Sequence, residues 1–380
     1  MSITSAYDAI IVGAGIVGAA CAAALARDGR RVLVLDGAFA SSGATAAGMG
    51  HLVAMDDSPA QLALTAYSVR LWAELARELP SAAEYQRCGT IWVAEDEQQL
   101  AIVHAKRSVY AAVGIASELL DARALADAEP FLRSGLAGGL LVPSDAVVYQ
   151  PQATLYLLQQ ARERGAMVRE HCRVRALVSH GVQLQSGETL GADVVINAAG
   201  AEAALLTPEL PVVPRKGHLV ITDRHPELCA HQLVELGYLT SAHMMSADSV
   251  AFNLQPRVTG QVLIGSSREL VGWDAHINPG IVQRMLQRAR DFMPALDHAS
   301  ILRTWTGFRP ATIDKLPLIG AWQRVPGLWI ATGHEGLGIA SALGTAQLIA
   351  DMIAGRTPAL DPSAYAPSRV VAEQRTEVAA

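Results

Sequence analysis

The stretch YDAIIVGAGIVG at residues 7–18 decides the fold. Residues 7–12 are mostly apolar and β-prone, which predicts a buried strand. An alanine-rich run at residues 19–28 then predicts a helix, and the apolar run at residues 31–35 predicts a second buried strand. A strand, a glycine turn, a helix and a second strand within about 30 residues make the βαβ unit that is typical of dinucleotide-binding domains.

The glycines of the turn point to the ligand that this unit binds. Gly13 permits a tight turn, Gly15 lets the backbone approach a pyrophosphate, and Gly18 allows close packing of helix on strand. The helix N-terminus adds free N–H groups and partial positive charge for the anion. Asp36 ends the second strand, where it can accept hydrogen bonds from a ribose and would repel the 2′-phosphate of NADP. The motif leaves NAD and FAD open, and a glycine-rich turn in an ordinary α/β core is the alternative.

The loop SSGATAAGMG at residues 41–50 has small and hydroxyl-bearing residues. Such a composition suits a backbone that runs close to a long ligand. Ser42 and Thr45 could donate hydrogen bonds to phosphate oxygens. The alternative interpretation is a flexible surface loop.

The rest of the chain shows two patterns. Helical spacing recurs at residues 59–79, 97–113, 151–164 and 279–292. Short extended runs with turns fill residues 211–268, which predicts an antiparallel sheet.

Elements of the nucleotide-binding type return in the middle and near the end of the chain. A strand at residues 192–196 ends in NAAG, and a strand at residues 327–332 runs through GHEGLG into an alanine-rich helix that reaches residue 353. The chain is therefore expected to pass repeatedly between a nucleotide domain and a second, β-rich domain. From about Pro362 the sequence is polar without apolar periodicity, so we expect a loosely held tail.

The composition excludes several classes of protein. Hydrophobic residues make up 51% of the 380 residues and charged residues 17%, which excludes a disordered or fibrous chain. A net charge of −6 argues against a nucleic-acid-binding protein, which needs a basic face. The four cysteines form no CxxC pair, which indicates a reduced, cytoplasmic setting. The uncharged residues 9–26 contain three glycines, which favours a strand, turn and helix over a membrane span or a signal peptide.

Four motifs in order carry a family resemblance over nearly the whole chain. The chain resembles the D-amino-acid oxidase/glycine oxidase family of FAD-dependent amine oxidoreductases. The motifs are VGAGIVG (residues 12–18) with Asp36, ATAAGMG (44–50), VVINAAG (194–200), and WTGFRPATIDKLPLIG (305–320) followed by ATGHEGLGIA (331–340). Within the family it is most similar to FAD subunits of bacterial amine dehydrogenases such as D-hydroxyproline dehydrogenase, hydrogen cyanide synthase and opine oxidase. The narrower similarity rests on residues 215–222 and 232–257 and on the GHEGLGI ending.

The resemblance implies FAD as the cofactor. Non-covalent binding is expected, because the C-terminal flavin loop has no cysteine where monomeric sarcosine oxidase carries its covalent attachment. The implied cofactor-binding positions are Gly13, Gly15, Ile16, Val17, Asp36, Ser42, Gly43, Thr45, Ala47, Gly48, Met49, Val174, Ala199, Gly200, Gly333, His334, Glu335, Gly336, Leu337, Gly338 and Ile339.

The substrate positions follow from the same resemblance. Arg309, in GFRP, matches the arginine that binds the substrate carboxylate, and a planar guanidinium can bind such a group bidentately. A surface or ion-paired arginine is the alternative. Tyr238, His51, His243 and His334 are candidates for shaping the pocket, although a lone histidine is more often structural. No side chain is assigned as catalytic, because the flavin accepts the hydride and a neutral substrate amine needs no base.

The resemblance also implies the fold and its division. The expected class is α/β, α+β overall, with a Rossmann-like FAD-binding domain interleaved with an antiparallel-sheet substrate domain. The FAD-binding domain is expected at residues 1–84, 146–210 and 300–365, the substrate-binding domain at 85–145 and 211–299, and a tail at 366–380.

The expected activity is oxidation of a D-amino or imino acid to the imine by hydride transfer to flavin N5. The preferred substrate is cis-4-hydroxy-D-proline, with D-proline, and the electrons pass to an acceptor other than NAD, because the chain has one GxGxxG unit. The alternatives are a glycine- or sarcosine-type oxidase that uses O₂, the FAD subunit of an opine dehydrogenase or a cyanide-forming glycine dehydrogenase, and a non-catalytic FAD-binding subunit. The expected partners are a small amino or imino acid, an unidentified electron acceptor, and other subunits or further copies of the chain. The expected location is the cytoplasm, or the periphery of the inner membrane through the acceptor.

Overall fold

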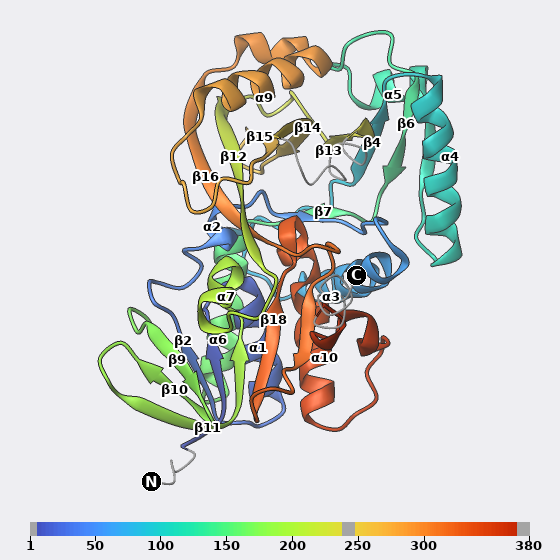
Figure 1. Cartoon of the computed structure of the whole chain (residues 1–380). Coiled ribbons are helices and arrows are strands. Elements are labelled where there is room, and N and C mark those ends of the chain that lie inside the picture. The colour runs from blue at the N-terminus through green and yellow to red at the C-terminus, as the bar shows by residue number, and fades with distance from the viewer. Residues whose placement is uncertain (1–5, 238–247, 371–380) are drawn as a thin grey trace, which may run out of the picture.

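The structure is a computed structural model, and it describes residues 6–237 and 248–370. Two eight-stranded sheets lie one above the other and meet at a junction in the middle of the molecule (Figure 1). The chain crosses this junction several times, so residues far apart in sequence lie along it. This interleaving places the candidate site between the two sheets.

The lower sheet is the nucleotide-type sheet. Its core strands are parallel and buried on both faces: the main helices cover one face, and the β-hairpin at residues 174–184 together with a short helix covers the other. Its strand order is β17 (Leu318–Ala321), β18 (Leu328–Thr332), β11 (Thr189–Asn197), β1 (Tyr7–Val12), β2 (Val32–Leu35) and β8 (Met167–Arg169), and the hairpin β9 (Val174–Val178) and β10 (Gly181–Leu184) continues from β11. Its main helices are α1 (Ile16–Arg27), α3 (Pro59–Leu75), α6 (Gln150–Glu163) and α10 (Gly338–Ile353).

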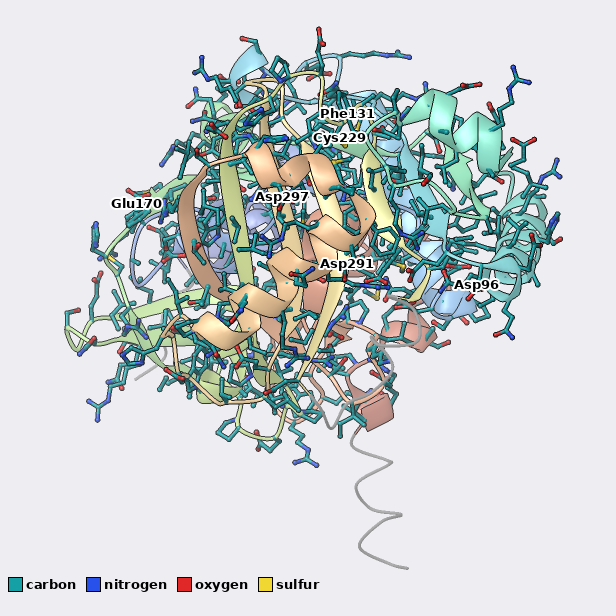
Figure 2. All side chains as sticks on the ribbon, turned by 90° about the horizontal axis from the view of Figure 1, so that it is seen from above. Asp96, Phe131, Glu170, Cys229, Asp291 and Asp297 are labelled. Carbon is teal, nitrogen blue, oxygen red and sulfur yellow. The ribbon has the colours of Figure 1, made fainter. Side chains whose placement is uncertain are left out.

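The upper sheet is mostly antiparallel and covers the junction from above. Its strand order is β16 (Ile301–Ala311), β12 (Val213–Arg224), β15 (Gln261–Arg268), β14 (Ser249–Pro256), β13 (Gln232–Glu235), β4 (Thr90–Ala94), β6 (Gly138–Val142) and β5 (Glu118–Asp121). Only the β13–β4 pair among the described strands of this sheet is parallel. Figure 2 shows α9 (Pro279–Phe292) lying across the outer face of the sheet. The Phe292 ring of α9 stacks on Phe252 of β14 with centroids 4.4 Å apart, which fixes the helix on the sheet.

Shorter elements complete the described chain. They are α2 (Ala44–Ala47), β3 (His51–Leu52), α4 (Glu97–Ala112), α5 (Ala122–Ala128), β7 (Ala146–Val147), α7 (Ala203–Leu206), and the 3₁₀ turns at Ser81–Ala83, Gly200–Glu202, Pro294–His298, Glu335–Leu337 and Pro362–Tyr365.

The predicted fold class is confirmed by this arrangement of a parallel and a mostly antiparallel sheet. The helices expected at residues 97–113, 151–164 and 279–292 form α4, α6 and α9 within one or two residues. The domain limits stay a prediction. Residues 301–311, grouped in that prediction with the FAD-binding domain, form β16, which pairs along its length with β12 of the upper sheet.

The expectation of a loose tail from about Pro362 is wrong for residues 362–370. Tyr365 is buried, and its hydroxyl donates a hydrogen bond to the Ala60 carbonyl at 2.7 Å. Arg369 forms an ion pair with Asp314 at 2.6 Å. One buried aromatic ring and one ion pair hold this segment, and neither produces a periodic pattern in the sequence.

Among residues 6–237 and 248–370, one helical stretch, Glu335–Ile353, is long and apolar enough to cross a membrane. A little over half of its most apolar window, 56%, is buried inside the molecule. The stretch includes α10, which packs against α1 and α3. A core helix of the nucleotide-type half explains its composition. Residues 9–26 divide into β1, the glycine turn and α1, as the sequence predicts.

Candidate functional site

A cavity of about 930 Å³ lies at the junction of the two sheets. The glycine turn, the 41–50 loop and the C-terminal GHEGLG loop line it from the nucleotide-type half. Strands β12, β14, β15 and β16 line it from the upper sheet. A large cavity of mixed apolar and polar lining at a domain junction is the usual setting of a cofactor and substrate site.

The glycine turn cannot accommodate side chains. Gly13 has a positive φ of 108°, in a region that side-chain-bearing residues avoid. A Cβ on Gly18 would lie 1.9 Å from the Gly13 carbonyl oxygen. Helix α1 therefore packs closely against the turn, and the helix N-terminus is brought to the cavity wall.

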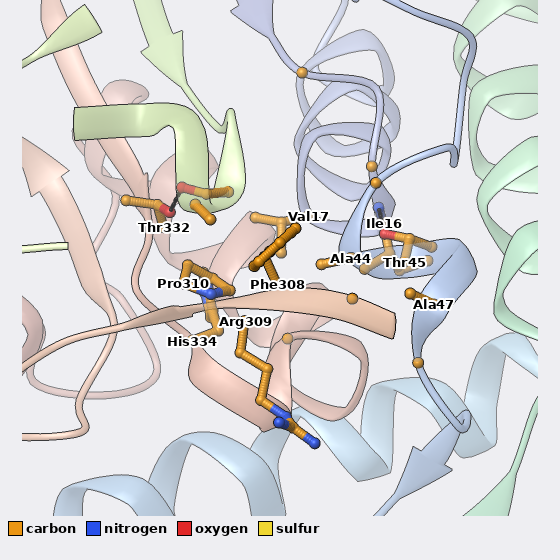
Figure 3. A pocket seen from close by; sticks show the side chains of 18 of the residues that line it. Ile16, Val17, Ala44, Thr45, Ala47, Phe308, Arg309, Pro310, Thr332 and His334 are labelled. Atoms are coloured by element: carbon orange, nitrogen blue, oxygen red, sulfur yellow. Dashed lines mark hydrogen bonds between the residues drawn. The ribbon is translucent and has the colours of Figure 1, made fainter. Parts of the chain in front are cut away.

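The N-terminus of α1 is shaped for an anion. Its N-cap residue, Gly15, offers no side chain to cap the helix. One N–H, that of Ile16, donates to the Thr45 hydroxyl oxygen at 3.0 Å (Figure 3). Thr45 therefore joins the 41–50 loop to the helix, and its own hydroxyl hydrogen can still serve a ligand. Gly15, Val17, Ser42 and Gly43 line the cavity beside it, and a phosphate there would face the positive end of the helix dipole.

Asp36 lines the cavity and also orders the turn. Its carboxylate accepts hydrogen bonds from the Ala14 N–H at 2.7 Å and the Ala38 N–H at 2.8 Å. An ionised carboxylate can accept about four hydrogen bonds, so capacity remains for a ribose hydroxyl. The ribose role of Asp36 stays a prediction.

The cavity continues beyond Asp36 along β9 and the NAAG strand end. Val174, Ala199 and Gly200 all lie on its wall. The Gly200 carbonyl accepts a hydrogen bond from the Thr332 hydroxyl at 2.8 Å, which ties the NAAG end to β18 (Figure 3). The residues predicted from separate motifs therefore share one wall.

The loop at Ala47–Met49 is held by three side chains that the sequence motifs did not reveal. Trp305 Nε1 donates to the Ala47 carbonyl at 3.2 Å, Gln150 Nε2 to the Gly48 carbonyl at 2.8 Å, and Gln255 Nε2 to the Met49 carbonyl at 2.7 Å. The three donors come from β16, α6 and β14. Both halves of the molecule thus fix this wall, and only the tertiary fold brings the donors together.

The C-terminal loop lines the cavity beside the 41–50 loop, because a Cβ on Gly48 would lie 3.0 Å from Ile339 Cδ1. His334, Glu335, Gly336, Leu337, Gly338 and Ile339 line the cavity, whereas Gly333 is not among the lining residues. Gly333 has a positive φ of 80° and sits against Thr312, so its part is to turn the chain into the loop.

Two members of this loop are fixed by buried contacts. The His334 ring is hydrogen-bonded through Nε2 to the Thr345 hydroxyl at 2.9 Å, and burial lowers its pKa to about 3, so the ring is neutral at physiological pH. Glu335, with a positive φ of 47°, forms an ion pair with the buried Arg215 at 2.7 Å. These contacts set the loop's shape independently of any ligand.

Arg309 enters the cavity from β16. Phe308 and Arg309 leave the strand on opposite sides, as alternation requires (Figure 3). The side chain of Arg309 passes over Gly217 of β12, and its Nη1 donates to the Ser267 carbonyl of β15 at 2.9 Å. A Cβ on Gly336 would lie 3.6 Å from Arg309 Nε, so the guanidinium and the C-terminal loop meet.

Gly217 makes room for this guanidinium, which gives a prediction. A Cβ at residue 217 would lie 2.2 Å from Arg309 Nη1. The clash falls on the end of a flexible side chain, so we expect Gly217→Ala to fold and to bind FAD but to displace the guanidinium. KM for a carboxylate-bearing substrate should rise at least about tenfold, the effect of losing one charge-assisted hydrogen bond. The measurement is steady-state kinetics, together with the flavin-to-protein ratio as the check that FAD is bound. Gly280→Ala, on α9, is the control for a glycine-to-alanine change outside the cavity, and it should leave KM unchanged. An unchanged KM would contradict the placement of Arg309.

His51 lies on the cavity wall at the start of β3, next to the 41–50 loop. Its Nε2 is hydrogen-bonded to the Thr90 hydroxyl at 2.8 Å. Burial lowers its pKa to about 3, so this ring is also neutral. Thr90 in turn interacts with Asp145, a fully buried carboxyl.

Burial of Asp145 gives a prediction for stability. Desolvation raises its pKa to about 7, and the Thr90 hydroxyl and Lys106 offset this only in part. A raised pKa means that the folded state holds the proton longer than the unfolded state, so stability falls as pH rises from about 4 to 7. Between pH 5 and pH 8 this site should remove about 2–3 kcal/mol from the free energy of unfolding. Urea unfolding at both pH values should show that Asp145→Asn loses this difference relative to the wild type. Equal pH dependence in the two proteins would count against a neutral buried carboxyl.

Two predicted substrate residues, Tyr238 and His243, lie outside the described residues. Several cavity residues were not predicted from sequence: Trp92, Val234, Asn253 and Ser266 of the upper sheet, and Trp273 in the turn after β15. The first three occupy one row across neighbouring strands, because Trp92 pairs with Val234 and Val234 pairs with Asn253. The alternation of side chains along β4 and β14 could have shown which residues of each strand share a face of the sheet. It could not show that these strands lie close together, because that depends on strand pairing.

The residues present fit FAD. The cavity is lined by the glycine turn, by the N-terminus of α1, by the small residues of the 41–50 loop and by strands of the upper sheet. A phosphate-bearing ligand with a long planar ring needs these features in this order. When bound, FAD supplies a ring that accepts a hydride.

Comparisons with known proteins agree with this geometry. A sequence model of the DAO family, described as FAD dependent oxidoreductase, matches residues 8–352. A crystal structure of glycine oxidase from Geobacillus kaustophilus superposes with a TM-score of 0.85 at 28% identity, covering 95% of this chain and 98% of that one. The D-amino acid dehydrogenase of Cereibacter sphaeroides (strain ATCC 17029) and the hydrogen cyanide synthase subunit HcnC of Pseudomonas aeruginosa are each 28% identical, with 96% of both chains covered. The chain therefore belongs to the DAO family of FAD-dependent oxidoreductases, and FAD is its cofactor.

Proposed function

We propose that this protein oxidises the CH–NH bond of a small amino or imino acid, with FAD as the hydride acceptor. The observation that carries the proposal is the position of Arg309, which reaches across Gly217 into the FAD cavity beside the C-terminal loop. A guanidinium there can bind a carboxylate bidentately and hold the neighbouring carbon in one orientation. The glycine oxidase and D-amino acid dehydrogenase relatives act on substrates that carry such a group.

The chain's own residues would contribute position and electrostatics. Arg309 binds the substrate carboxylate, and strands β12, β14 and β15 cover the reacting atoms from water. Helix α10 begins at Gly338 on the cavity wall, so the positive end of its dipole would stabilise negative charge that develops during the reaction.

We further propose a D-configured imino acid, cis-4-hydroxy-D-proline first and D-proline second. The resemblance to D-hydroxyproline dehydrogenases supports this choice. Two polar groups of the cavity wall also support a substrate that carries a hydroxyl. Trp92 and Ser266 line the cavity, and their Nε1 and hydroxyl groups are buried without a hydrogen-bond partner in the described parts of the chain. Buried polar groups of this kind usually meet a ligand or water, and a ring hydroxyl would satisfy one of them.

An anaerobic titration tests this proposal. The purified protein should carry the yellow flavin spectrum, and the spectrum should bleach on addition of cis-4-hydroxy-D-proline or D-proline. The panel should include their L-isomers, glycine, sarcosine and opines. Bleaching by glycine or an opine alone would replace the proposed substrate, and bleaching by none would contradict amine oxidation.

The same preparation distinguishes a dehydrogenase from an oxidase. We propose that electrons leave to an acceptor other than NAD, so an artificial dye should sustain turnover and hydrogen peroxide should form slowly. Peroxide formation at the rate of flavin reduction would instead support the oxidase alternative. We also propose association with further subunits, since the HcnC relative is named as a subunit. A cytoplasmic or membrane-peripheral location, set by the electron acceptor, is part of the same proposal.

A further inference from the structure

An exposed tryptophan lines the FAD cavity. Trp273 lies in the turn after β15, on the cavity wall, and is 46% exposed. All six tryptophans of the chain lie within the described residues, and the other five are buried or half-buried. An exposed indole leaves a large apolar surface in contact with water, which is unfavourable. On the wall of a cofactor cavity, such a surface indicates that the bound ligand covers it.

The Phe308 ring of β16 supports the indole from one side. The ring centroids of Phe308 and Trp273 lie 5.2 Å apart with an interplanar angle of 61°, which is an edge-to-face contact. Figure 3 shows Phe308 projecting from β16 toward Val17 at the N-terminus of α1, whereas Arg309 leaves the strand on the other side. The aromatic pair therefore lies on the side of β16 away from the guanidinium that we assign to the substrate carboxylate.

The contact between β16 and the 41–50 loop places this pair relative to the cofactor. Gly307 precedes Phe308, and a Cβ on Gly307 would lie 2.4 Å from the Ala47 Cβ. The same loop reaches the first turn of α1, where the Thr45 hydroxyl accepts from the Ile16 N–H at 3.0 Å. The pair therefore lies beside the loop and the helix N-terminus that would hold the pyrophosphate.

The turn that carries the indole is fixed to β12 and β16. The buried Lys216 of β12 exchanges two backbone hydrogen bonds with Glu269, each 3.0 Å long. Its ammonium forms ion pairs with the carboxylates of Glu269 at 3.4 Å and Asp274 at 3.5 Å. The Thr306 hydroxyl of β16 donates to the Ala275 carbonyl at 2.8 Å. Because these contacts lie on both sides of the indole in sequence, the protein itself sets the position of the ring.

We propose that Trp273 and Phe308 form a cofactor clamp, in which the two rings cover the pyrophosphate-bearing part of bound FAD and slow its release. FAD is the occupant, because the pair lies toward the N-terminus of α1 and the 41–50 loop, with Arg309 on the other side of β16. Excluding water there strengthens the interaction of the phosphates with the helix dipole. The inference rests on FAD as the cofactor and is independent of the substrate that is oxidised.

The test follows the release of FAD from the holoenzyme after dilution, measured as the loss of protein-bound flavin with time. Trp273→Ala should release FAD at least about tenfold faster than the wild type, because it removes an aromatic ring that covers the ligand. Trp273→Phe keeps a ring and should restore slow release. Phe131→Ala is the matched control, since Phe131 is 43% exposed and is not among the residues that line the cavity. It should release FAD as the wild type does.

A second readout needs neither turnover nor a substrate. In ¹⁹F NMR of protein labelled with fluorotryptophan, the resonance of residue 273 is the one that Trp273→Phe removes. FAD binding to the apoprotein should shift this resonance and should reduce its solvent-isotope shift between H₂O and D₂O, because the indole becomes covered. The same solvent-isotope shift with and without FAD would overturn the clamp.

The kinetic outcomes separate the clamp from amine oxidation. Unchanged FAD release in Trp273→Ala would overturn the clamp and would leave the proposed reaction as it stands. A rise in KM with unchanged FAD release would assign the indole to the substrate and would equally overturn it. Faster FAD release, in a wild type whose flavin no amino acid reduces, would support the clamp while contradicting amine oxidation.

Discussion

Arg309→Ala is expected to lower kcat/KM for an amino or imino acid by roughly 30- to 5,000-fold while FAD remains bound. Removing one partner of a desolvated, hydrogen-bonded charge pair costs about 2–5 kcal/mol, which gives this range. The effect should appear mainly in KM if the guanidinium binds the carboxylate equally in the substrate and the transition state. Steady-state kinetics and the flavin-to-protein ratio together provide the measurement.

The matched control is Arg303→Ala on the same strand. Arg303 is exposed, and its guanidinium lies over the Trp305 ring at 5.5 Å, outside the FAD cavity. We expect this variant to behave as the wild type does toward substrate. Equal kinetic constants for Arg309→Ala and the wild type would remove the carboxylate role from Arg309.

Gly18→Ala should abolish FAD binding or prevent folding. The added Cβ would lie 1.9 Å from the Gly13 carbonyl oxygen, and neither atom can move unless the backbone of the turn or of α1 moves. Either α1 moves away from β1 or the turn opens, and each change removes the helix N-terminus from the pyrophosphate position. Fluorescence titration of the apoprotein with FAD should show at least a 100-fold loss of affinity wherever the variant is soluble.

Gly280→Ala is the control for this substitution. Gly280 lies in the first turn of α9, and its added Cβ would meet only the Asn278 side chain at 3.4 Å. This variant should bind FAD normally. Normal FAD affinity in Gly18→Ala would show that the turn is not packed as described.

The nucleotide-type half was predictable because its determinants are local. The GxGxxG spacing, the strand before it and the helix after it lie within residues 7–35, so short-range sequence carries the whole unit. The 41–50 loop was predicted to lie along the cofactor from its composition and from the family resemblance, and the GHEGLG loop from the resemblance. The structure brings both to one cavity, with Gly333 set back as a turn residue.

The upper half was predictable only as a sheet. Residues 211–268 show strands by their alternation, but the order β16–β12–β15–β14–β13–β4 includes the pair β13–β4, whose strands lie more than 100 residues apart in sequence. That pairing puts Trp92 and Asn253 in one wall and Thr90 beside His51. No sequence pattern predicts such contacts, because each strand could pair with many other strands that have the same alternation of apolar and polar residues.

The account depends most on a carboxylate bound beside the flavin. The direct measurement compares anaerobic bleaching of the wild-type holoenzyme by D-proline with bleaching by pyrrolidine, which has the same ring and amine but no carboxylate. We predict bleaching by D-proline, and by cis-4-hydroxy-D-proline, at concentrations at least 100-fold below any that pyrrolidine requires. Equal bleaching by pyrrolidine, or a flavin that no carboxylate-bearing amine reduces, would contradict the account.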